Sequence, residues 1–163
     1  TPPGADVPLP EEGGPQPVTG AVGEAQRRWL EAVEPRLARN KRLVFDLWRE
    51  IVDAGREQNA SRYMERDFIE HNPNVGMGLA GFRRHFASRP DRDIQPWIKA
   101  PVVALVAESD IVVLVTMQQH PHPARPGRTY TTTWFDMFRI EDGKIAEYWD
   151  DAEPGESPRE STW

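Results

Sequence analysis

The sequence predicts an α+β fold in which N-terminal helices pack against a curved antiparallel sheet of four or more strands. From residue 24 to residue 64, apolar residues recur at steps of three and four, the period of a helix with one buried face. After Pro90 the period becomes two, which indicates strands. A sheet covered by helices on one face leaves room for a pocket between the two layers.

Each element can be placed approximately. The most regular helix is predicted in NKRLVFDLWREIVDAG, with Asn40 as its N-cap and Gly55 as its stop. Shorter helices are expected over residues 59–64 and 79–88. Strands are expected over residues 97–107, 111–120, 129–140 and 145–150, and a tight turn joins the last two.

The chain of 163 residues is long enough for one domain with a full hydrophobic core, expected over residues 23–151. Residues 1–22 hold six prolines and four glycines, which predicts an extended or disordered segment. Residues 152–163 have a similar composition and are expected to form a flexible tail.

Composition excludes several classes of function. A net charge of −6, with Arg interleaved among Asp and Glu, argues against a nucleic-acid partner. No apolar run approaches the ~18–20 residues that a membrane helix needs. Without cysteine, disulfides and thiolate chemistry are excluded. We expect a soluble protein, cytoplasmic or exported, because Thr1 fits both a mature end after signal removal and a chain cut at that point.

Asp136 most needs an explanation, because it lies inside a predicted strand with Trp134, Phe135 and Phe138 around it. A buried charge is costly unless it is paired or its pKa shifts. Asp136 is therefore either the structural partner of a buried cation or a proton-transferring group, and the sequence leaves both readings open.

Gln118 and His120 share one face of the preceding strand, and the hairpin register decides whether Asp136 joins them. A two-residue turn at Pro126 and Gly127 turns Asp136 to the other side. A three-residue loop puts Gln118 directly across from Asp136. Pro-Gly turns suit two-residue hairpins poorly, so the second register is favoured.

Other polar residues lie in a predicted loop and in the last strand. His71 and Asn72 precede a proline, and they are expected to steady a substrate oxygen unless they form a plain solvated turn. Tyr148 and Asp150 share one face of the last strand and Trp149 lies on the other. One of these two sets is expected to meet the pocket or a partner subunit.

A zinc site is the remaining candidate. His120 and His122 lie two residues apart on a strand, and His71 and Asp136 would complete a set of ligands. The proline between the two histidines weakens this geometry. We therefore expect no metal and no other cofactor.

Two stretches, EHNPNVGMGLAGFRRHF (residues 70–86) and DMFRIEDGKIAEYWD (residues 136–150), resemble the SnoaL-like branch of the nuclear-transport-factor-2-like (NTF2-like) superfamily. The resemblance covers roughly residues 41–151. It implies a cone-shaped α+β fold around a deep pocket, often in a homodimer. In the polyketide cyclases of this branch an aspartate closes a ring by an aldol reaction without a cofactor, and a His and a Gln help to hold the substrate.

Asp136 matches that aspartate, with His120 and Gln118 two strand positions apart on the preceding strand. The chain departs from the family pattern where relatives often carry His in place of Tyr148 and Gln in place of Glu70. These departures leave the substrate open.

We therefore expect cofactor-free acid/base catalysis in an apolar pocket, in which Asp136 abstracts a proton next to a carbonyl of a small apolar molecule. The reaction would be an aldol cyclisation or an isomerisation. His120 would orient Asp136, and Gln118 would bind the substrate. The apolar walls would come from Trp134, Phe138 and Trp149.

Two alternatives stay open. One is a non-catalytic protein that binds a small molecule or dimerises through its open sheet face. The other is an epoxide-opening hydrolase. The strand face of Asp136 shows no evident second carboxylate, which counts against this alternative.

Overall fold

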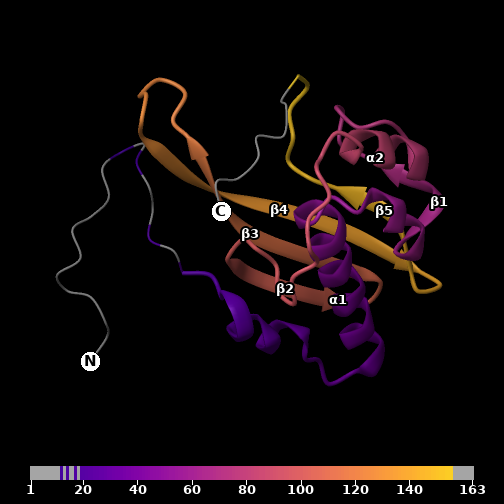
Figure 1. Ribbon diagram of the computed structural model, residues 1–163. Helices are drawn as coiled ribbons and strands as arrows, with labels where there is room; N and C mark the ends of the chain where they lie inside the picture. Colours follow the sequence, from indigo (N-terminus) through magenta and orange to yellow (C-terminus); the bar gives the residue numbers. More distant parts are fainter. Residues whose placement is uncertain (1–11, 13, 15–16, 18, 156–163) are drawn as a thin grey trace, which may run out of the picture.

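The structure is a computed structural model that describes residues 12, 14, 17 and 19–155. Most of residues 1–22 and 152–163, whose expected disorder stays a prediction, lie outside the described residues. Within them, helices cover the concave face of a curved sheet (Figure 1). The elements in chain order are η1 (Gly23–Leu30), α1 (Pro35–Leu47), η2 (Trp48–Asp53), η3 (Glu57–Arg62), β1 (Met64–Glu70), α2 (Gly78–Phe86), β2 (Val102–Glu108), β3 (Ile111–Pro121), β4 (Thr129–Glu141) and β5 (Lys144–Trp149).

The sheet has five strands in the order β1-β5-β4-β3-β2. The predicted antiparallel meander is confirmed in β2 to β5. The fifth strand, β1, was not predicted, and it runs parallel to β5. Its residues 65–67 are Glu, Arg and Asp, so this edge strand lacks the β-rich composition by which strands are recognised.

The main helix begins earlier than predicted. Pro35 occupies the first turn of α1, where the missing N–H of proline costs nothing, and Asn40 is buried inside the helix instead of capping it. Gly55 is the predicted stop. It adopts a φ of +72°, and a Cβ there would lie 2.6 Å from the carbonyl oxygen of Pro90.

The end of this helix widens into the π-helical turn η2. Such turns are frequent at functional sites, because they turn side chains out of the regular helical register. Trp48, Val52 and Asp53 of η2 all face the space between the helices and the sheet. No helix among the described residues is long and apolar enough to cross a membrane.

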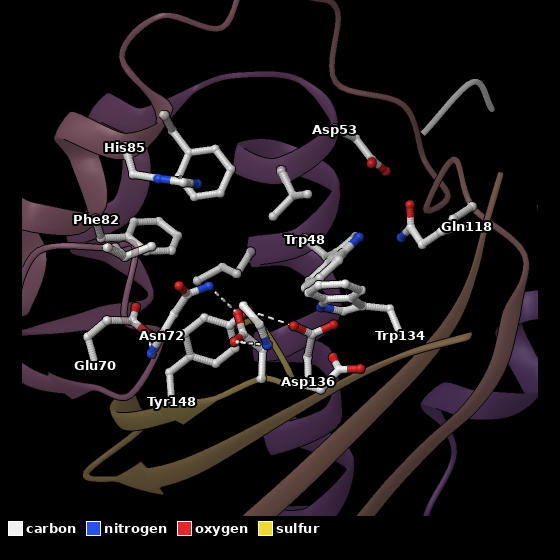
Figure 2. Close-up of a pocket in the computed structure, with 18 of the residues that line it drawn as sticks. Trp48, Asp53, Glu70, Asn72, Phe82, His85, Gln118, Trp134, Asp136 and Tyr148 are labelled. Carbon is white, nitrogen blue, oxygen red and sulfur yellow. Dashed lines mark hydrogen bonds between the residues drawn. The ribbon is translucent and has the colours of Figure 1, made fainter. Parts of the chain in front are cut away.

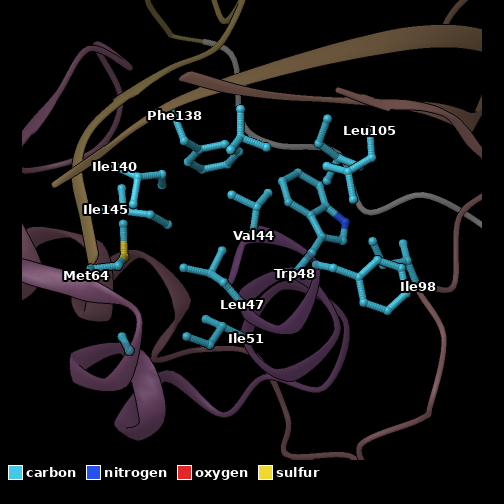
Figure 3. Packing of buried hydrophobic residues seen from close by; sticks show 14 of the residues in the cluster. Val44, Leu47, Trp48, Ile51, Met64, Ile98, Leu105, Phe138, Ile140 and Ile145 are labelled. Atoms are coloured by element: carbon cyan, nitrogen blue, oxygen red, sulfur yellow. The ribbon is translucent and has the colours of Figure 1, made fainter. Parts of the chain in front are cut away.

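The core lies between α1 with η2 and the concave face of the sheet (Figure 3). Val44, Leu47 and Ile51 point from the helix toward Phe138 and Ile145 on the strands, and all five are almost completely buried. Burying each such side chain contributes roughly 1.5–3 kcal/mol. This packing holds the helical layer at one end of the sheet and leaves the other end open.

Candidate active site

A cavity of about 820 Å³ lies between the concave face of the sheet and the helices. This volume falls within the range of roughly 300–1,000 Å³ that is typical of small-molecule sites. Aromatic and apolar side chains from α1, η2, α2 and β4 form much of its wall. The predicted pocket between the two layers is therefore present.

The strand register differs from both predicted alternatives. Leu114 lies across from Asp136, whereas Gln118 lies across from Thr132 and His120 across from Tyr130. The hairpin loop is longer than predicted, because β3 ends at Pro121 and β4 begins at Thr129. The prediction that Gln118 lies opposite Asp136 is wrong by four positions. Because four is even, Gln118 and His120 still share the concave face with Asp136.

Asp136 lies at the centre of the cavity wall and is fully buried. Its Oδ1 accepts a hydrogen bond of 2.6 Å from the hydroxyl of Tyr148. Oδ2 accepts no hydrogen bond of regular geometry from the described residues, although the indole of Trp134 lies close enough to the carboxyl group to lower its pKa. Burial raises the pKa of Asp136 well above its ordinary value, and the hydrogen bond from Tyr148 opposes that rise. The carboxyl group therefore holds a proton at pH values where an exposed aspartate is ionised.

A chain of polar contacts connects Asp136 to the loop after β1 (Figure 2). The hydroxyl of Tyr148 also lies 3.4 Å from Oδ2 of Asp150, which accepts a 2.6 Å hydrogen bond from Nδ2 of Asn72. Burial raises the pKa of Tyr148 well above its ordinary value, so this phenol stays a neutral donor. The chain continues from Asn72, whose backbone N–H donates to Oε1 of Glu70 at 2.9 Å.

Glu70 is a second buried carboxyl group of the cavity wall, and it was not predicted as a site residue. Its Oε2 has no hydrogen-bond partner among the described residues. Burial raises the pKa of Glu70 to about 7, the backbone hydrogen bond from Asn72 opposes this, and the charge of Asp150 adds to it. From the sequence, Glu70 was noted only as a departure from the family pattern, because β1 was not predicted. The signal was the alternation of Met64, Phe68 and Glu70 on one face.

Two further titratable residues line the helical side of the cavity. His85 projects from α2 beside Phe82 (Figure 2), and burial lowers its pKa, with Arg89 contributing. Burial raises the pKa of Asp53 in η2 to about 6, while the backbone N–H of Lys99 donates to its carboxyl group at 2.8 Å and opposes the shift. Neither residue was predicted as a site residue, because a lone His or Asp in a helix carries no sequence signal of its own.

The predicted site residues divide into three groups. Trp134, Phe138, Tyr148, Asp150 and Asn72 line the cavity around Asp136. Gln118 and His120 line the same cavity at a distance. Gln118 lies on the far side of Trp134 from Asp136 (Figure 2). His120 is six residues from Leu114 along β3, which is about 20 Å. His120 therefore does not orient Asp136 as expected; its ring packs instead against Tyr130 at 5.5 Å.

The third group, His71 and Trp149, lies on the outer face of the sheet and not in the cavity. The two rings stack at 4.9 Å, and Nε2 of His71 lies 2.8 Å from a carboxylate oxygen of Glu147. The expectation that His71 steadies a substrate oxygen and Trp149 forms an apolar wall is wrong, because side chains alternate across a strand and these two follow Glu70 and Tyr148. Among the described residues, no group of three or more His, Asp or Glu is placed to hold a metal.

The curved sheet, the covering helices and the enclosed cavity define an α+β cone of the NTF2-like class. The chain belongs to the SnoaL-like polyketide cyclase family, whose model matches residues 42–153. No curated protein matches the chain.

Solved structures agree on the fold. A "putative polyketide cyclase" from Acidithiobacillus ferrooxidans aligns with a TM-score of 0.54 at 16% identity, over 74% of this chain and 90% of the other. An LEH-like epoxide hydrolase from M. tuberculosis aligns with a TM-score of 0.50 at 13% identity, over 71% and 84%. A de novo designed protein with a curved β-sheet also has a TM-score of 0.50 at 13% identity, over 71% and 86%. Because these structures share the fold but differ in kind, the fold does not specify the reaction.

Proposed function

We propose that this protein is a cofactor-free acid/base catalyst that moves protons on a small, largely apolar carbonyl compound. The observation that carries the proposal is the Asp136 carboxyl group, which is fully buried in the cavity wall, with one oxygen bound by Tyr148 and the other without a regular hydrogen bond to the described residues. The reaction class would be enolisation, followed by aldol ring closure or by isomerisation. Membership of a cyclase family supports this class, and the substrate itself stays open.

The environment of Asp136 suits proton transfer at neutral pH. An exposed aspartate has a pKa near 4 and is a weak base, whereas burial raises the pKa of Asp136 and makes its carboxylate a stronger one. Tyr148 would hold the carboxylate when it forms and also place a neutral hydroxyl next to the substrate. Trp134, Phe138 and Trp48 would bind apolar rings.

Access is part of the mechanism, because Asp136 exposes no surface in this conformation. The indole of Trp134 lies beside the carboxyl group (Figure 2). A flat ligand that displaces this ring would reach Oδ2 directly. Gln118 and His120, at the far end of the cavity, would then bind a distal part of a long substrate and not the reacting atoms.

The first test follows exchange of the protons next to the carbonyl of 1-tetralone, a bicyclic ketone, for deuterium by NMR in D2O. We expect the wild type to accelerate exchange and Asp136→Asn to lower the rate by roughly 100-fold or more, the range of general acid–base contributions. Asn keeps the volume and a hydrogen-bond acceptor, so a similar melting temperature would separate loss of a base from loss of the fold.

A non-catalytic binding protein is the alternative. It would bind the ketone equally well with Asp or Asn at position 136 and would leave the exchange rate at that of buffer. Epoxide opening is distinguished in the same series by adding styrene oxide and measuring the diol. Epoxide opening needs further polar groups next to Asp136, and Tyr148, Asp150 and Asn72 would supply them.

We also propose that the protein forms a homodimer through the outer face of its sheet. This face carries the exposed apolar side chains of Phe135, Val106 and Ile69, which are 53%, 49% and 44% exposed. Packing these side chains against a second subunit would remove their apolar surface from water. Equilibrium sedimentation of the full chain tests the proposal, and a monomer at micromolar concentration would contradict it.

A further inference from the structure

We propose that Glu70 is a second proton-transferring group of the cavity, so that Glu70 and Asp136 serve in one turnover as a base and an acid. This inference rests on the proposed function and adds to it a residue that the sequence analysis did not include among its candidates.

The strand pairing brings the two carboxyl groups to one face. Glu70 lies next to Tyr148 across the β1–β5 pair, and Tyr148 lies next to Phe138 across the β5–β4 pair. Asp136 precedes Phe138 by two positions, so its side chain points to the same face. The two carboxyl groups therefore lie on either side of Tyr148. Their backbones are about 10 Å apart across the strands and about 7 Å apart along them, which is about 12 Å in all. The two side chains extend from these positions into the same cavity, where a ligand with fused rings can contact both.

The hydrogen bonding of the two groups is alike. Each has one bound oxygen, Oε1 of Glu70 by the N–H of Asn72 at 2.9 Å and Oδ1 of Asp136 by Tyr148 at 2.6 Å. Each has one buried oxygen without a regular hydrogen bond to the described residues. Glu70 is 5% exposed and Asp136 is fully buried, so bulk water does not supply the missing hydrogen bonds to these oxygens. Leaving a buried polar atom unpaired is costly, and at such a site a ligand that supplies the partner gains affinity.

Several titratable groups face Glu70 from the elements around it. They are Tyr148 from β5, Asp150 directly after β5, Asp136 from β4 and His85 from α2, all of which line the same cavity. Burial and the charge of Asp150 raise the pKa of Glu70 to about 7, so near neutral pH it both donates and accepts protons. Carboxyl groups in different environments are a common way to divide acid and base roles.

The chemistry balances with these two groups alone. The ionised carboxylate takes a proton from the carbon next to the carbonyl, and the electrons of that C–H bond form the C=C bond of an enol. The carbonyl oxygen takes the proton of the protonated carboxyl group. In an aldol closure the enol carbon then bonds to a second carbonyl carbon, whose oxygen receives a proton while the enol oxygen loses one. The pair ends with the one proton it began with.

The test uses the same deuterium exchange of 1-tetralone with the full chain. We expect Glu70→Gln to lower the rate by roughly 100-fold and to abolish the limb of the pH–rate profile near pH 7. Glu50→Gln is the matched control, because Glu50 is also a buried glutamate (8% exposed) but lies outside the cavity. Glu70→Asp keeps a carboxyl group one methylene further back, and it should retain the limb near pH 7 at a reduced rate.

The outcomes separate the two proposals. If Asp136→Asn loses exchange while Glu70→Gln keeps both the rate and the limb near pH 7, the role of Glu70 is overturned and the proposed function stands. An equal loss in Glu50→Gln would also overturn it, because the effect would then not be specific to the cavity.

If the wild type does not exceed the rate of buffer, the proposed function fails and Glu70 is judged by titration. The carboxyl carbon of Glu70 is followed by NMR with and without 2-naphthol, an enol analogue. A midpoint near 7 that moves by a unit or more on binding supports proton exchange between Glu70 and a bound enol. An unmoved midpoint overturns it.

Discussion

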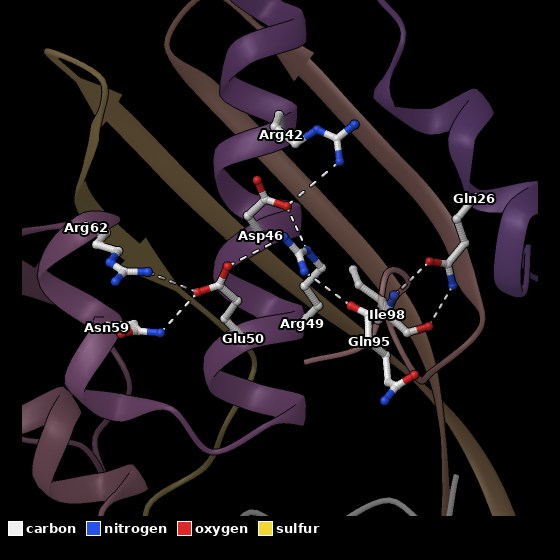
Figure 4. A network of polar contacts seen from close by, with 9 residues as sticks. All are labelled: Gln26, Arg42, Asp46, Arg49, Glu50, Asn59, Arg62, Gln95 and Ile98. Atoms are coloured by element: carbon white, nitrogen blue, oxygen red, sulfur yellow. Dashed lines mark hydrogen bonds and ion pairs between the residues drawn. The ribbon is translucent and has the colours of Figure 1, made fainter. Parts of the chain in front are cut away.

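The buried carboxyl groups of this protein differ in how far their oxygens are hydrogen-bonded, and Glu50 contrasts with the two carboxyl groups of the cavity. On the outer side of the helical layer, Oε1 of Glu50 lies 3.5 Å from Arg49, and its Oε2 lies 3.2 Å from Asn59 and 3.9 Å from Arg62 (Figure 4). Both oxygens of Glu50 have a close polar partner, whereas Glu70 and Asp136 in the cavity each keep one oxygen that has no regular hydrogen bond to the described residues.

The same contrast holds for buried amides. Gln26 is fully buried, and its side chain donates to the carbonyl oxygen of Ile98 while accepting from the N–H of Ile98 (Figure 4). It also donates to the carbonyl oxygen of Ala100. It ties η1 to the segment before β2 and leaves no polar atom unused. A buried polar residue with a structural role finds hydrogen-bond partners for all its polar atoms within the fold. A buried polar atom without a regular partner therefore distinguishes a candidate site from a structural network.

Removing Glu50 should have the largest effect on stability. Glu50→Ala removes the carboxylate that Asn59 and Arg49 contact and opens a small cavity, although Arg49 keeps its contact with Asp46. We expect a loss of roughly 3 kcal/mol, because a hydrogen bond to a charged group contributes about 1.5–3 kcal/mol and the contact of Glu50 with the exposed Arg62 adds little. Chemical denaturation measures it, and a loss below that of Asp136→Asn would contradict the contrast between Glu50 and the cavity carboxyl groups.

Glu70 should make the folded protein less stable as pH rises. The pKa of Glu70 is raised from 4.5 to about 7, so the unfolded chain loses this proton before the folded protein does. Stability from this group is therefore full below about pH 4.5 and is lost as pH rises to about 7, by at most about 3 kcal/mol. Denaturation of Glu70→Gln at pH 5 and pH 8 should show a smaller difference than in the wild type; an equal difference would contradict the pKa shift.

Tyr148 connects the two cavity carboxyl groups and should have an intermediate effect. Tyr148→Phe removes the hydroxyl that stabilises the carboxylate of Asp136, so the pKa of Asp136 should rise further. The limb of the pH–rate profile that reports Asp136 should therefore move to higher pH. The free energy of unfolding should fall by about 1 kcal/mol, the contribution of one hydrogen bond. A profile that does not move would mean that the hydrogen bond has no part in tuning Asp136.

The smallest effect on the folded subunit is expected on the outer face of the sheet. Phe135→Lys replaces a half-exposed ring at a position without a cavity contact, and should change the free energy of unfolding of a single subunit by about 0.5 kcal/mol or less. Sedimentation should nevertheless show a shift from dimer to monomer. Unchanged mass would place any subunit contact elsewhere.

The sequence by itself determined the α+β class and the meander of β2 to β5, whereas it only favoured the face on which Asp136 lies. The class and the meander follow from hydrophobic period, which is local and depends on few neighbours. The identity of Asp136 as the central buried carboxyl group also followed, since a charge among Trp134, Phe135 and Phe138 stands out within a strand.

Only the tertiary structure decided which groups meet Asp136. The length of the hairpin loop moved Gln118 and His120 four positions along β3, and parallel pairing of β1 with β5 brought Glu70 to the cavity instead. Strand register and the pairing of distant segments depend on the packing of the whole sheet, which no local pattern encodes. The partners of a buried charge are therefore a property of the fold, whereas its burial could be predicted from the sequence.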